Sequence, residues 1–97
     1  MADINELLQE KRVEIISTAT KHGVLNIRIF GSAARGEATE DSDIDMLVEM
    51  EPNRSLLDLS DLHTDMEVLL GRKVDIVTED SIYWLLRRRI LKEAVPL

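Results

Sequence analysis

The chain contains no cysteine, so neither a disulfide framework nor a thiolate metal site is available to it. Aromatic residues make up only 3% of its 97 residues, so aliphatic side chains must build the core. No apolar run approaches the roughly 20 residues that a membrane-spanning helix needs. The first residues are acidic and amphipathic, unlike a secretory signal peptide. These absences predict a cytoplasmic protein that does not bind membranes.

Positive charge is also scarce. The chain has 12 Lys and Arg against 19 Asp and Glu, which gives a formal net charge of −7. An acidic surface repels nucleic-acid backbones, so stable nucleic-acid binding is not expected. A small nucleotide carried with a divalent metal stays compatible, because the metal brings positive charge to the site. The length suits one small domain, and we expect residues 1–97 to form it.

Hydrophobic periodicity predicts long helices between short strands. Helical spacing covers residues 3–22, 55–70 and 81–94, and a short helix is expected at 32–35. Alternating or β-branched apolar residues predict strands at 24–30, 43–49 and 73–78. This order predicts an α/β (α+β) fold in which helices pack on a small sheet of about three strands.

Several residues are expected to begin these helices. Asp3 is a plausible N-cap for the first, and Asp80 or Ser81 for the last. Ser55 and Asp58 resemble a capping box at the start of the helix at 55–70.

Residues 30–49 carry the candidate chemistry and read FGSAARGEATEDSDIDMLVE. Gly31 and Ser32 are followed by ten residues and then by Asp43-Ile44-Asp45. Two residues apart on a strand, Asp43 and Asp45 project from the same face, roughly 7 Å apart along the backbone. Mg²⁺ is usually held by one or two carboxylates together with substrate phosphates. The aspartate pair therefore predicts a metal site.

The residues before the aspartates offer groups that bind phosphate. Gly31 permits a tight turn and close approach of the backbone to a ligand. Ser32 begins the expected short helix, so its hydroxyl and nearby N–H groups can meet an anion. Arg35 could bring a guanidinium to the same phosphates. Surface pairing of Arg35 with Glu37 or Glu40 is an equal alternative.

Asp75 lies in the apolar segment KVDIVT. An unpaired buried carboxylate is costly, so its place among Val and Ile favours a functional role. If this strand pairs beside the strand of Asp45, three carboxylates meet on one surface. Two metal ions could then be held there for an in-line displacement at phosphorus. The alternative is an exposed charge that protects an edge strand from further pairing.

The Gly-Ser pair, the spacer and the Asp-x-Asp motif resemble the signature of the DNA polymerase β-type nucleotidyltransferase superfamily. The segments FGSAARGE and SDIDMLVE are still more similar to its minimal nucleotidyltransferase (MNT) branch, with further likeness in KVDIVT and RRRILKEAVPL. Members of this branch are commonly the antitoxin partners of HEPN-domain toxins. The resemblance implies a mixed-sheet nucleotidyltransferase fold that uses Mg²⁺, with two ions expected, and takes ATP as substrate.

The resemblance also implies a role for each matching residue. Gly31 and Ser32 would hold the triphosphate, and Asp43 and Asp45 would bind the metal ions. Asp75 would be a third metal ligand or the base that takes the acceptor's proton. The implied reaction transfers AMP from ATP to a tyrosine of a partner HEPN toxin from a neighbouring gene.

The acceptor is expected to come from that partner or from a second copy, because no second domain is visible to hold it. Two other functions remain open. One is an antitoxin that blocks its toxin sterically, without catalysis. The other is nucleotidyl transfer to a small molecule, as in the larger aminoglycoside nucleotidyltransferases.

The final helix carries two further features. Arg87, Arg88 and Arg89 suit a solvated face near a helix C-terminus, where cations oppose the helix dipole, although one of them could face phosphate or a partner. Tyr83 and Trp84 are expected to pack against the protein, or to contact a partner if they are exposed.

Overall fold

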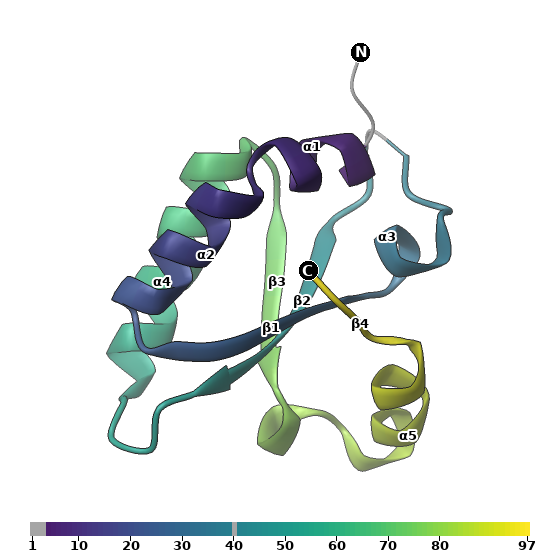
Figure 1. Cartoon of the computed structure of the whole chain (residues 1–97). Coiled ribbons are helices and arrows are strands. Elements are labelled where there is room, and N and C mark those ends of the chain that lie inside the picture. The colour runs from purple at the N-terminus through teal and green to yellow at the C-terminus, as the bar shows by residue number, and fades with distance from the viewer. Residues whose placement is uncertain (1–3, 40) are drawn as a thin grey trace.

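The structure is a computed structural model that describes residues 4–39 and 41–97, and Figure 1 shows its elements. In chain order they are α1 (Ile4–Glu10), α2 (Arg12–Lys21), β1 (Val24–Phe30), α3 (Ser32–Arg35), β2 (Ile44–Met50), α4 (Leu56–Leu70), β3 (Val74–Thr78), the 3₁₀ turn η1 (Glu79–Ser81), α5 (Trp84–Glu93) and β4 (Val95–Pro96). In the described part of the chain, no helix is long and apolar enough to cross a membrane.

Within residues 4–39 and 41–97, four strands form one mixed sheet in the order β3-β2-β1-β4. Strand β1 runs antiparallel to β2 and β4, whereas β2 and β3 are parallel. The predicted fold of helices packed on a small mixed sheet is confirmed. The fourth strand was not predicted, since two residues are too few for an alternating pattern. It pairs Val95 with Ile29 and so fastens the chain's end to β1.

The core is aliphatic, as the composition predicts. Helices α1, α2 and α4 contribute to one buried cluster with the sheet, and Figure 1 shows α2 and α4 side by side, away from α5. Its most deeply buried members are Ile4, Ile15, Ile44, Met46, Leu62, Met66 and Val74. Alternate residues of β2 therefore face this cluster, which leaves the other face of the strand for Asp45.

The helix expected at residues 3–22 is divided into α1 and α2 at Lys11. Backbone hydrogen bonds continue across the division, from Lys11 N to Leu7 O at 3.0 Å and from Ile15 N to Lys11 O at 2.8 Å. Asp3, the predicted N-cap, lies outside the described residues. The helix predicted at 55–70 is confirmed with its capping box, in which Ser55 N donates to Asp58 Oδ2 at 2.9 Å.

The prediction for residues 81–94 was wrong at its beginning. Helix α5 starts at Trp84, and neither Asp80 nor Ser81 caps it. The Ser81 hydroxyl instead accepts a hydrogen bond from Thr78 N at 3.0 Å, which closes the tight turn η1. Tyr83 and Trp84 are 59% and 72% exposed, so the expectation that they pack in the protein was also wrong.

The three arginines of α5 are exposed, as expected of a solvated helix face. Arg87 lies 3.9 Å from Glu79, which also forms an ion pair with Arg28 at 2.8 Å. These contacts connect α5 through η1 to β1.

Candidate active site

Two neighbouring strands bring the predicted carboxylates together. Strands β2 and β3 are parallel, and Asp45 and Asp75 are direct partners in their register. Residues paired in this way project from the same face of the sheet. Asp43 precedes Asp45 by two residues, directly before β2 begins. The pairing anticipated for the DID and KVDIV segments is confirmed, while the roles of the carboxylates remain predictions.

Burial falls on a different aspartate from the one that the sequence suggested. Asp75 is exposed, so its place in an apolar strand does not desolvate it. Asp45 is half-buried, and burial raises the pKa of its carboxyl to about 6, with the neighbouring charges of Asp75 and Asp43 adding to the rise. A carboxylate held among like charges favours a cation that would neutralise them.

The backbone of Gly31, at the end of the neighbouring strand β1, lies close to the Asp45 carboxylate. Its predecessor Phe30 is the register partner of Asp45, and Gly31 has a φ of 74°, a conformation that favours glycine. A methyl group built on Gly31 would overlap Oδ2 of Asp45. The glycine is therefore needed for close approach as well as for the turn.

Ser32 and Arg35 are the first and last residues of the four-residue helix α3, as predicted. Arg35 Nε donates to Glu37 Oε2 at 2.9 Å, so the expected surface pair forms, whereas Glu40 lies outside the described residues. The same guanidinium lowers the pKa of Asp45, against the larger effects that raise it. Arg35 therefore acts electrostatically on the carboxylate site while it is paired at the surface.

Glu93 belongs to this cluster and was missed from the sequence. Its carboxylate accepts hydrogen bonds from Gly31 N at 2.9 Å and from Arg35 Nη1 at 2.5 Å. Gly31 and Glu93 are separated by 62 positions, so no local pattern connects them. The likeness of RRRILKEAVPL to the same family was the one signal that pointed to this segment.

The donor set suits a hard cation that also binds substrate. Among the described residues, no three His, Cys, Asp or Glu side chains gather into a ready-made metal site. Mg²⁺ does not require one, because it commonly takes one or two carboxylates and completes its coordination with water and phosphate oxygens. Asp45, with Asp43 and Asp75 close enough to perturb it, offers such partial ligation.

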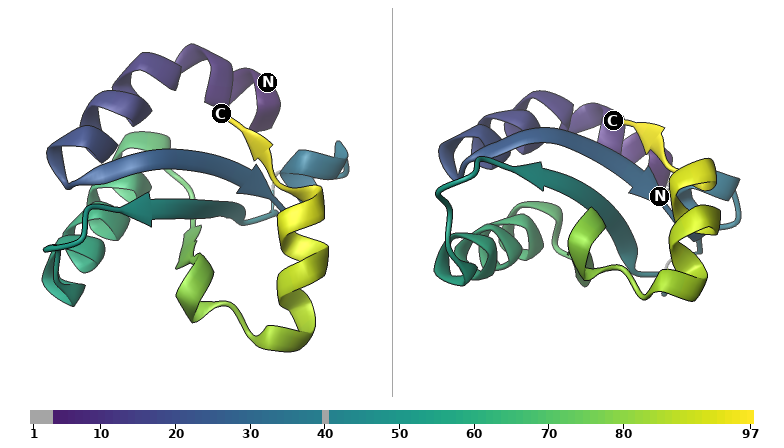
Figure 2. Two further views of the ribbon diagram at one scale, coloured as in Figure 1. Left: turned by 60° about the horizontal axis from the view of Figure 1, so that its bottom comes forward. Right: turned by 90° about the horizontal axis from the view of Figure 1, so that it is seen from below.

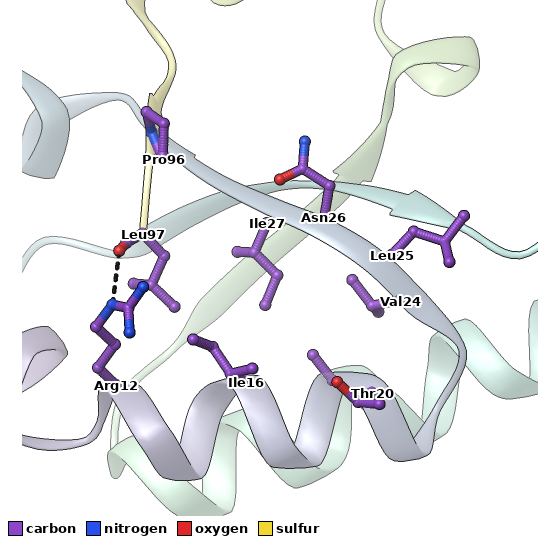
Figure 3. Close-up of a pocket in the computed structure, with 10 residues that line it drawn as sticks. Arg12, Ile16, Thr20, Val24, Leu25, Asn26, Ile27, Pro96 and Leu97 are labelled. Atoms are coloured by element: carbon purple, nitrogen blue, oxygen red, sulfur yellow. Dashed lines mark hydrogen bonds between the residues drawn. The ribbon is translucent and has the colours of Figure 1, made fainter.

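A separate hollow lies between α2 and the β1–β4 edge (Figure 3). Its lining is mainly aliphatic, and Arg12 Nε closes one end with a 3.0 Å hydrogen bond to the main-chain oxygen of Leu97. None of the aspartates described above lines it. This hollow therefore offers no group for the predicted metal chemistry.

Comparison with known proteins identifies the class that the sheet and its carboxylates define. Residues 9–97 match the family described as the nucleotidyltransferase domain, and the chain belongs to that family. It is therefore classed as an enzyme, a nucleotidyltransferase.

The relatives are more specific. The chain is 41% identical to protein adenylyltransferase MntA of Thermococcus cleftensis, over 92% of this chain and 96% of that protein. It is 50% identical to MJ0435 of Methanocaldococcus jannaschii, provisionally named a protein adenylyltransferase, over 93% of this chain and 97% of the other.

Solved structures agree on the fold. One provisionally named minimal nucleotidyltransferase aligns with a TM-score of 0.85 and 48% identity, covering 95% of this chain and 94% of that one. A toxin–antitoxin complex with AMP-PNP aligns with a TM-score of 0.73 at 22% identity, covering 87% and 69% of the two chains. The second likeness, at this identity, is one of fold alone.

Proposed function

We propose that this chain, as a single nucleotidyltransferase domain, transfers AMP from ATP to a hydroxyl of a partner protein with the help of Mg²⁺. The acceptor is a tyrosine of a HEPN-type toxin from a neighbouring gene, and the modification silences that toxin. The names of the relatives from Thermococcus cleftensis and Methanocaldococcus jannaschii support protein adenylylation. The resemblance of the sequence motifs to the minimal nucleotidyltransferase branch supports a cytoplasmic antitoxin, while the toxin–antitoxin complex with AMP-PNP shares the fold.

One observation carries the proposal. Asp45 and Asp75 are register partners on parallel strands, and Gly31 closes against the first of them. A turn suited to phosphate and a carboxylate pair suited to metal are therefore adjacent, although 44 positions of the chain separate Gly31 from Asp75. Nucleotidyl transfer requires these two functions to act on one triphosphate.

The chain's residues divide the work in the proposed reaction. Asp43 and Asp45 hold Mg²⁺, and Asp75 is a further ligand or takes the proton of the attacking hydroxyl. Bound Mg²⁺ supplies charge neutralisation on the triphosphate. Gly31 and Ser32 receive the phosphates, with Arg35 beside them. The acceptor oxygen forms a bond to the α-phosphorus as the bond to pyrophosphate breaks, and the hydroxyl proton passes to a base.

A partner protein is expected to supply the acceptor, and self-association of this chain stays open. Tyr83 and Trp84 support a protein partner, because exposed aromatic residues are enriched at interfaces.

Labelled ATP provides the direct test. The protein is incubated with Mg²⁺, ATP labelled at the α-phosphate and the toxin encoded beside it. We expect label on the toxin with wild-type protein and none with the Asp43→Ala, Asp45→Ala double variant. If wild-type protein binds metal but leaves the toxin unlabelled, transfer of AMP to this toxin is excluded. Toxin neutralisation that survives the double change would instead support steric blocking.

A further inference from the structure

The carboxylate of Glu93 lies between two groups of the proposed phosphate site. It comes from the last turn of α5, which Figure 2 shows beside the end of β1. Oε2 accepts from Gly31 N at 2.9 Å, and Oε1 accepts from the guanidinium of Arg35 at 2.5 Å. One side chain therefore bridges the turn that faces Asp45 and the cation at the end of α3.

The Glu93 side chain is more buried than the partner in an ordinary surface ion pair. Its side chain is only 15% exposed, whereas Glu37, the other partner of Arg35, is 65% exposed. Burial of the Glu93 carboxyl opposes its ionisation, yet hydrogen bonds from Arg35 and Gly31, together with the positive charges of Arg35 and Arg89, outweigh that effect and lower its pKa. A charged group held in this way by two donors fixes their separation, which a mobile exposed pair does not.

The backbone on either side of Glu93 is held in regular secondary structure, by α5 before it and by β4 after it. Helix α5 ends at Glu93, and two residues later Val95 pairs with Ile29 of β1. The side chain consequently reaches Gly31 from a backbone that is anchored to the strand leading into the turn.

We propose that Glu93 is a positioning residue for ATP, holding the Gly31 turn and the Arg35 guanidinium in the arrangement that receives the triphosphate. This role deepens the proposed function and rests on it. Glu93 does not contact the reacting phosphorus but acts through Gly31 and Arg35. Loss of its carboxylate should therefore weaken nucleotide binding more than it slows the chemical step.

Glu93→Gln is the primary variant, because both partners are hydrogen-bond donors and an amide oxygen cannot replace two carboxylate oxygens. We expect about tenfold weaker binding of Mg·ATP by calorimetry, close to the lower end of the range for one hydrogen bond to a charged group. The KM for ATP should rise by a similar factor while kcat changes less. Glu37→Gln is the matched control, since it removes the negative charge of the other Arg35 partner and leaves Gly31 untouched. We expect its affinity to stay within about twofold of wild type.

A second comparison tests whether the effect passes through Arg35. In an Arg35→Gln background, Glu93→Gln should have a smaller effect on affinity than in wild-type protein, because one of its two contacts is already gone. Equal effects in both backgrounds would overturn the coupling. Circular-dichroism melting checks that each variant is folded. If Glu93→Gln does not fold, Glu93→Asp replaces it, and the shorter side chain is expected to weaken binding because it cannot bridge both donors.

The outcomes separate this inference from the proposed function. Unchanged or tighter ATP binding by Glu93→Gln overturns the positioning role, and tighter binding would show that the carboxylate competes with phosphate. Wild-type protein that binds Mg·ATP but never transfers AMP overturns the proposed function, while the comparison of affinities still decides the role of Glu93. Wild-type protein that does not bind Mg·ATP overturns both.

Discussion

At the scale of single residues, the site depends on the close packing of the Gly31 backbone against the Asp45 carboxylate. Gly31 directly follows β1, Asp45 lies in the adjacent strand β2, and any side chain at residue 31 would meet the Asp45 carboxylate. The glycine thus serves two purposes, a positive φ and a close approach. A comparison of alanine substitutions at Gly31 and at Gly36, which also has a positive φ but open space around it, distinguishes them.

Gly31→Ala should reduce nucleotidyl transfer by roughly 100-fold, because displacement of a catalytic group by about 1 Å can cost that much. Gly36→Ala is the matched control. Gly36 has a φ of 73°, nearly that of Gly31, but an added methyl group there meets nothing within 4 Å. Both variants place an alanine at a positive φ, with more backbone strain at Gly31, where ψ is −153°, than at Gly36, which is left-handed helical with a ψ of 19°. Only Gly31→Ala also disturbs Asp45. Equal losses of activity would attribute the effect to strain alone.

The raised pKa of Asp45 predicts a pH-dependent stability. An unfolded aspartate titrates near a pKa of about 4, whereas Asp45 titrates at about 6 in the fold. The folded state therefore binds more protons between these values, and this group's contribution to stability falls as pH rises from about 4 to about 6. Asp45→Asn removes that cost, so its stability relative to wild type should increase over the same range.

Urea unfolding at a series of pH values measures this difference. The variant should gain on wild type between about pH 4 and pH 6 and keep a constant advantage above. A difference between the two proteins that does not depend on pH would contradict the assignment.

At the scale of elements, α4 was the helix best predicted from the sequence. Its start depends on local chemistry, since the Ser55 hydroxyl accepts from Leu57 N at 3.2 Å and Asp58 returns a bond to Ser55 N. Such a cap depends only on residues that are neighbours in the sequence, so it can be predicted without knowledge of the fold.

Ser55→Ala should lower the free energy of unfolding by about 1 kcal/mol, the usual cost of an N-cap loss. Ser60→Ala, an exposed change in the middle of the same helix, should have little effect or stabilise slightly. Denaturant midpoints of the two variants make the comparison. A Ser55→Ala protein as stable as wild type would show that core packing alone fixes the beginning of α4.

The C-terminal segment shows where sequence reasoning fails. Residues 79–83 contain polar residues that resemble helix caps, but Ser81 bonds back to Thr78 and the helix begins only at Trp84. Strand β4 has only two residues and exists because β1 offers an open edge. The two-residue strand carries no local pattern, whereas the Thr78–Ser81 contact is local but resembles the start of a longer helix.

At the scale of the whole molecule, the candidate site is assembled from four segments. Gly31 follows β1, Asp45 lies in β2, Asp75 in β3 and Glu93 at the end of α5. The first three were identified from motif and strand pattern, because each segment carries a recognisable signal. Glu93 depends on α5 and β4 returning to β1, a long-range arrangement that only the fold supplies.

The overall charge fits this arrangement. A net charge of −7 gives ATP no general attraction, so binding must depend on local cations. Mg²⁺ at the aspartates and the Arg35 guanidinium are the groups assigned to that task. Removal of divalent metal with a chelator should therefore abolish ATP binding, and added Mg²⁺ should restore it.

The central claim is that this protein transfers AMP to a partner toxin and needs Asp43 and Asp45 to do so. The most direct measurement is the intact mass of the neighbouring toxin after co-expression with wild-type protein or with the Asp43→Ala, Asp45→Ala variant. The account predicts toxin heavier by one or more AMP units with wild type and unmodified toxin with the variant. Unmodified toxin in a neutralised complex with wild-type protein would contradict it.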